Sequence, residues 1–193
     1  MPDFVDFMLR TGSPRLTKVK ELKTRPSYHP GTDYWKALRD KIIAAHQTGY
    51  DKDTVNSILV NLDSKKVRRY SAAVKGYHRF IGKKKPPWFS PPRATWTIED
   101  LEVNINPELG LEIGGQRMAI KLHFKENQLK KQNADIILLM MNQALGANLA
   151  HGDTVAILDV ERAKLFSSTG ANASLMPLLH GEAVAFSTIW AQI

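Results

Sequence analysis

The stretch LGLEIGGQRMAIKLHF at residues 109–124 carries the strongest structural signal in the chain. On both sides of Gly114 and Gly115, apolar residues alternate with polar or small ones, which is the pattern of half-buried strands. A Gly-Gly pair favours a two-residue hairpin, because the primed turns that join such strands require positive φ. The sequence therefore predicts a β-hairpin with strands at 109–113 and 117–125.

The hairpin turn also predicts which side chains face each other across the two strands. A two-residue loop places Glu112 opposite Arg117 and Glu108 opposite Lys121, on the sheet face away from the apolar stripe. Ordinary cross-strand ion pairs on an exposed face would contribute about 0.2–1 kcal/mol each. The same pairs are also candidates for a chemical site.

The segments around the hairpin complete a predicted small mixed sheet with helices. Residues 101–105 alternate like a strand, so together with the hairpin they predict a three-strand meander. The following segments predict a crossover helix at 130–145, a buried strand at 154–160, a short strand at 164–166 and a C-terminal helix that Ser174 can cap. The expected fold class is therefore α+β.

Charge and proline content divide the chain. Of the 27 Lys and Arg residues, 20 lie in residues 1–93 beside 8 acids, whereas residues 94–193 hold 7 beside 11 acids. Four prolines within 86–92 forbid a helix and favour an extended connector at this break. The expected organisation is an N-terminal arm at 1–33 that docks or stays mobile, a basic helical lobe at 34–85, a Pro-rich linker at 86–93 and an α/β lobe at 94–193.

The last helix of the basic lobe is the strongest candidate for binding a polyanion. Apolar residues recur at helical spacing over 67–81, which predicts one buried stripe with cations on the opposite flank. Residues 64–85 contain nine Lys and Arg and no acid, although mixed signs would stabilise an isolated helix better. Nucleic-acid phosphates would explain this imbalance. The candidate residues are Lys65, Lys66, Arg68, Arg69, Lys75, Arg79, Lys83, Lys84 and Lys85. A solvated basic face, or one neutralised by the acidic lobe, is the alternative.

Composition excludes several classes of protein and of site. The 193-residue chain has no Cys, which excludes disulfide scaffolds, Cys-ligated zinc and thiol catalysis. No apolar run approaches the roughly 20 residues that cross a bilayer, and the acids at Asp3 and Asp6 argue against a signal peptide. We therefore expect a cytoplasmic protein without a membrane partner. The six histidines show no metal-binding spacing, and no phosphate-binding glycine motif occurs.

The predicted order of helix, meander, crossover helix and further strand, over residues 64–167, resembles the core of the PD-(D/E)XK nuclease superfamily. This resemblance implies an acid on the second core strand and an acid-x-Lys motif on the third, with the acids holding Mg²⁺ and the lysine activating water. Glu108 or Glu112 would be the first acid and metal ligand, and Lys121 the lysine. Ala119 stands where the family has its second acid. Another carboxylate would have to replace it, from Glu102, Asp135 or Asp159.

Three functional hypotheses follow from these patterns. The leading one is a nucleic-acid-binding protein, for DNA or RNA, that grips phosphates with its basic helix. The second is a Mg²⁺-dependent nuclease that uses Glu108, Glu112 and Lys121. The third is a non-catalytic interaction module that binds another protein or forms a homo-oligomer.

Overall fold

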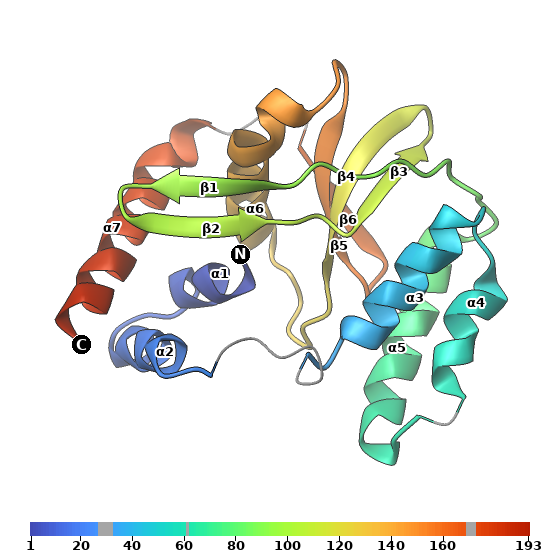
Figure 1. Ribbon diagram of the computed structural model, residues 1–193, viewed down its shortest axis with the longest axis horizontal. Helices are drawn as coiled ribbons and strands as arrows, with labels where there is room; N and C mark the ends of the chain where they lie inside the picture. The colour runs from blue at the N-terminus through green and yellow to red at the C-terminus, as the bar shows by residue number, and fades with distance from the viewer. Residues whose placement is uncertain (27–32, 61, 169–172) are drawn as a thin grey trace.

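The computed structural model describes residues 1–26, 33–60, 62–168 and 173–193 and shows an α+β fold (Figure 1). This confirms the predicted fold class. A four-stranded sheet with the order β3-β4-β5-β6 lies at the centre. Its strands are β3 (Leu109–Ile113), β4 (Gln116–His123), β5 (Thr154–Asp159) and β6 (Lys164–Ser167).

The Gly-Gly hairpin has the predicted register. Gly114 and Gly115 both have positive φ, and Glu112 pairs with Arg117 across the antiparallel β3 and β4. Helix α6 (Lys131–Leu145) then carries the chain from β4 to β5, which pairs with β4 in parallel. A parallel pair needs such a crossover connection, whereas β5 and β6 are antiparallel neighbours joined by a short turn.

The predicted three-strand meander is wrong. Strand β2 (Leu101–Ile105) pairs with β1 (Ala94–Ile98) in a separate two-stranded sheet. It does not pair with β3. The Pro-rich segment holds that edge instead, because the Phe89 amide donates to the Gly110 carbonyl (2.9 Å) and the Glu112 amide to the Pro87 carbonyl (3.0 Å). The segment at 86–93 is therefore docked on the sheet.

Both faces of the four-stranded sheet are covered by helices. One face packs Ile120, Ala156 and Leu158 against α3 (Lys36–Gln47) and α5 (Ser64–Ile81), with the short α4 (Lys52–Asn56) beside them. The other face packs Val155 and Ile157 against α6 and the β1–β2 hairpin. Burial on both faces explains the continuous apolar run of β5.

The sequence left open whether the N-terminal arm docks on the protein or stays mobile. Residues 1–26 dock on it. Helices α1 (Pro2–Met8) and α2 (Ser13–Lys23) lie beneath the β1–β2 hairpin, next to the C-terminal α7 (Met176–Gln192) (Figure 1). Phe7 is fully buried, and its ring meets that of Phe186 edge to face at 5.1 Å. Residues 27–32 of the predicted arm lie outside the described residues.

Helix α5 has the predicted stripe with one correction. Tyr70, Val74 and Tyr77 are buried, but Val67 is 44% exposed. The buried arc is rotated toward Gly76, whose lack of a side chain lets the helix approach the β5–β6 turn directly. Asp63, one residue before the predicted cap, accepts the Lys65 amide at 2.8 Å.

Candidate functional site

Helix α5 presents a row of cations on its outer flank. Its buried side is anchored by Tyr70 and Tyr77, so the residues on the opposite arc must point outward. The helix ends at Gly82, which has a φ of 61°, and the chain continues into three exposed lysines. The exposed cations of this flank are Lys65, Arg68, Lys75, Arg79, Lys83, Lys84 and Lys85. We call this set the α5 basic flank.

Two of the nine predicted cations, Arg69 and Lys66, are half-buried and held by contacts within the protein. Arg69 reaches Glu126 at 2.9 Å and Glu161 at 3.6 Å, and its side chain is only 27% exposed. Lys66 lies over the rings of Tyr34 and Tyr70, with its Nζ 5.4 and 6.0 Å from the ring centroids. Arg69 therefore joins α5 to the loops that carry Glu126 and Glu161, and Lys66 covers two tyrosine rings, so both are poor candidates for binding an external anion.

The remaining internal contacts of the α5 basic flank are weak. Arg68 approaches Glu126 at 3.7 Å, but the side chains are 84% and 65% exposed, so the pair contributes at most about 1 kcal/mol. Arg79 donates one hydrogen bond of 3.1 Å to the Glu161 carbonyl, which leaves other guanidinium donors available. A phosphate could therefore recruit both arginines without breaking a buried interaction.

An aromatic depression adjoins the first turn of α5. The Trp35 ring stacks between those of Tyr70 (5.2 Å) and Phe124 (4.9 Å). A depression of about 630 Å³ opens beside this stack, with Lys65 and Lys125 among its lining residues. The sequence assigned Trp35 only to an apolar helix face, because its neighbour Phe124 comes from the distant end of β4.

The two linker aromatics pack back on the protein. Trp88 bridges to Leu111 at the edge of β3, and the guanidinium of Arg117 lies 4.2 Å above the Phe89 ring. Neither ring extends the α5 basic flank.

The structure brings Glu108 and Lys121 together as the register predicts. Lys121 Nζ donates to Glu108 Oε1 and, at 3.0 Å, to the Asn106 carbonyl, while Glu108 Oε2 accepts the Leu122 amide at 2.7 Å. The two side chains are only 10% and 13% exposed, so this pair is largely buried and not a surface pair. Both carboxylate oxygens already have donors.

The second predicted pair does not form an ion pair. Glu112 faces Arg117 in the strand register, but Arg117 turns to Asp153 at 3.5 Å and to the Phe89 ring. Glu108 directly precedes β3, and Glu112 lies four residues further along and is half-buried. The two proposed metal ligands therefore do not converge.

The other carboxylates do not complete a Mg²⁺ site. Glu102 belongs to the other sheet, Asp135 pairs with Lys131 at 2.7 Å, and Asp159 is fully buried, where it accepts the Leu129 amide at 3.1 Å. Among the described residues, no group of three or more acidic or histidine side chains could hold a metal ion. Mg²⁺ is commonly held by one or two carboxylates together with a substrate phosphate. Here the candidate carboxylates lie apart, and both oxygens of Glu108 already accept hydrogen bonds from Lys121 and from the Leu122 amide.

Two further observations bear on the class of protein. Within the described residues, no helix combines the length and apolar character needed to cross a membrane. Comparisons with protein-family models, with curated proteins and with solved structures find no match to this chain.

Proposed function

We propose that this protein binds nucleic acid through the α5 basic flank. One observation on α5 carries the proposal. Arg69 forms ion pairs with the nearby carboxylates of Glu126 and Glu161, while the cations of the α5 basic flank stay exposed to solvent. A helix that tolerates this like-charge repulsion gains from a polyanion, because each neutralised phosphate releases condensed counterions.

The aromatic depression supports contact with unpaired bases as well as with phosphates. Tyr34 lines it beside Lys65, and stacking of a base on such a ring contributes about 1–3 kcal/mol. Trp35 already stacks on Tyr70 and Phe124 and forms part of the wall. A single strand that follows the α5 basic flank would therefore have both kinds of contact available at the first turn of the helix.

A salt series tests the proposal. Binding of labelled single-stranded DNA, duplex DNA and single-stranded RNA is measured by fluorescence anisotropy at several salt concentrations. We expect log Kd to rise linearly with log salt, with a slope that reports the number of neutralised phosphates. Absent affinity at low salt, or affinity that salt does not change, would contradict the proposal.

Neutralising variants locate the contact. The triple variant Lys65→Gln, Arg68→Gln and Lys75→Gln should lower the salt slope by roughly 2–3, since each lost phosphate contact removes about 0.7–0.9. Lys20→Gln, Lys130→Gln and Lys131→Gln together remove the same charge from α2 and the start of α6 and should leave the slope unchanged. An equal decrease of the salt slope in both triple variants would indicate a general effect of net charge and would contradict the assignment of the contact to α5.

Light scattering distinguishes the self-association hypothesis. If the α5 basic flank serves a second copy of the chain, the mass should fall with added salt while nucleic acid has no effect. That pattern would exclude the proposed function.

A further inference from the structure

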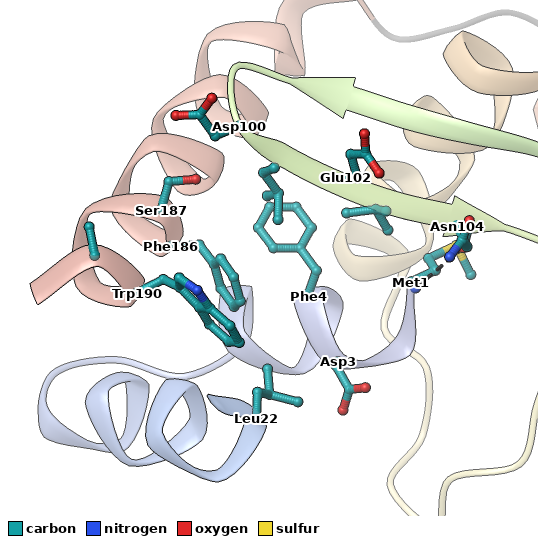
Figure 2. A pocket seen from close by; sticks show the side chains of 13 residues that line it. Met1, Asp3, Phe4, Leu22, Asp100, Glu102, Asn104, Phe186, Ser187 and Trp190 are labelled. Atoms are coloured by element: carbon teal, nitrogen blue, oxygen red, sulfur yellow. Dashed lines mark hydrogen bonds between the residues drawn. The ribbon is translucent and has the colours of Figure 1, made fainter. Parts of the chain in front are cut away.

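A second surface lies at the opposite end of the molecule from α5. A groove of about 660 Å³ lies between strand β2, helices α1 and α2, and helix α7. Figure 2 shows the side chains that line it. Residues 100–104 form one wall in succession, so the groove follows the edge of β2. Phe4, Phe186 and Trp190 face that wall from the helices (Figure 2).

The edge of β2 that borders the groove carries unpaired backbone groups. In an antiparallel hairpin closed by Ile98 and Leu101, the amides and carbonyls of Glu102 and Asn104 point away from β1. The Asn104 carbonyl indeed accepts the Met1 amino group at 3.4 Å from that side. Within the described residues, the Glu102 amide and carbonyl and the Asn104 amide have no hydrogen-bond partner outside the hairpin.

The two faces of β2 offer different side chains to an added strand. Glu102 lies on the exposed face and Asp100 is exposed in the turn before the strand, and no ion pair to either occurs among the described residues. Asp3, across the groove, is already matched by Lys18 at 3.0 Å and Arg25 at 2.9 Å. The unmatched acidic side chains at the rim are therefore those of the β1–β2 turn and of β2, while the Met1 ammonium lies further along the strand at the Asn104 carbonyl.

The opposite face of β2 leads into an aromatic row. The Phe186 ring meets Phe4 edge to face at 5.8 Å and stacks with Trp190 at 5.9 Å. Trp190 remains 39% exposed, which leaves apolar surface along the groove. Leu101 and Val103 point toward this side, in alternation with the acids.

We propose that this groove binds an extended peptide of another protein, which adds to β2 as a third strand. Its cationic side chains, Lys or Arg at alternate positions, lie beside Asp100 and Glu102, and its apolar side chains between them face Phe186 and Trp190. Backbone hydrogen bonds to the Glu102 amide and carbonyl and to the Asn104 amide supply the pairing, and the alternation supplies the specificity.

A capped hexapeptide of alternating Val and Lys is the probe, titrated against the full chain by calorimetry and by tryptophan fluorescence. We expect saturable binding at or below about 1 mM, and no binding of the matching Val and Glu hexapeptide. Failure of the Val and Lys peptide to bind at that concentration, or equal binding of both peptides, overturns the proposal.

Backbone methylation separates strand addition from simple capture of a cation. One probe is N-methylated at its Lys amides and another at its Val amides, and only one of these sets can face β2. We expect one methylated peptide to lose binding and the other to keep it. Equal binding of both would show that no backbone pairing occurs and would refute the added strand.

A charge reversal on β2 tests the location. Glu102→Lys should weaken binding of the Val and Lys peptide roughly tenfold or more. Glu21→Lys makes the same charge change on the exposed side of α2, outside the groove, and should leave the affinity within about twofold. Equal effects of the two variants would place the peptide elsewhere.

Discussion

The ion pair between Glu108 and Lys121 is the clearest case of a single residue whose role depends on burial. On an exposed sheet the pair would contribute little, but here both side chains are almost enclosed and the Leu122 amide also depends on Glu108. Removing one partner leaves the other charge buried and alone. We therefore expect Glu108→Ala to lower the free energy of unfolding by about 3 kcal/mol, measured by urea denaturation.

The matched control is Glu112→Ala, four residues further along the chain in β3. Glu112 makes no ion pair with Arg117, so the change should stay within about 0.5 kcal/mol. The double variant Glu108→Leu with Lys121→Met should cost less than Glu108→Ala, because it leaves no unpaired charge. Equal losses at positions 108 and 112 would show that burial of the pair is unimportant.

His46 makes stability depend on pH. Its side chain is buried between α3 and α5, with Nε2 at 2.5 Å from the Tyr77 hydroxyl and Nδ1 without a partner in the described residues. Burial lowers the pKa of His46 from 6.5 to about 4. Between these values the unfolded chain binds a proton at His46 and the folded protein does not, so folding weakens as pH falls.

We expect this residue to contribute a loss on the order of 3 kcal/mol between pH 6.5 and pH 4. Well above pH 6.5 both states are neutral at this position, and its contribution no longer changes. The measurement is urea unfolding of the wild type and of His46→Phe across that range. Subtracting the two profiles removes the effects of other groups, and a difference that does not vary with pH would refute the prediction.

At the scale of elements, the contact between α5 and the β5–β6 turn depends on one glycine. A Cβ at Gly76 would lie 2.1 Å from the Val160 carbonyl oxygen and 2.6 Å from that of Glu161. Alanine is the better helix former by about 1 kcal/mol, but the clash involves backbone that cannot rotate away. We therefore expect Gly76→Ala to destabilise the protein by about 2–3 kcal/mol in thermal or urea unfolding.

Gly181→Ala is the internal control. Gly181 lies in α7, where an added Cβ meets nothing within 4 Å, so the same substitution should stabilise by about 0.5–1 kcal/mol. The two variants should therefore change stability in opposite directions. If both stabilised the protein, the close approach of α5 would be wrong.

The sequence predicted those elements that local chemistry determines. The Gly114–Gly115 turn set the register of β3 and β4, and the spacing of Tyr70, Val74 and Tyr77 set the buried side of α5. It could not predict the neighbour of β2, because the docked linker and β2 compete for the same edge of β3. That choice depends on packing between distant segments, not on alternation within a strand.

The α5 basic flank could also be predicted only in part from the sequence. Helical period placed Lys65, Arg68 and Lys75 on an outer flank, where the structure has them. The sequence could not predict the partners of Arg69, because Glu126 and Glu161 come from loops far along the chain. The aromatic depression was missed for the same reason, since it joins α3 to the end of β4.

At the scale of the whole molecule, the central sheet joins two helical layers into one unit. The core between the sheet and α5 and the core between the sheet and α6 use alternate residues of the same strand, β5. Ala156 and Leu158 belong to the first core, and Val155 and Ile157 to the second. If β5 left the sheet, the side chains of both cores would be exposed to water.

This sharing predicts that the two layers unfold together. Gly76→Ala directly perturbs α5 and the β5–β6 turn but not α6. It should nevertheless lower the opening free energy of the slowest amides in α5, β5 and α6 by the same 2–3 kcal/mol or so. Native-state hydrogen exchange measures each amide separately. If α5 lost protection while α6 kept it, the sheet would not couple its two faces, and the basic helical segment would open as a unit of its own.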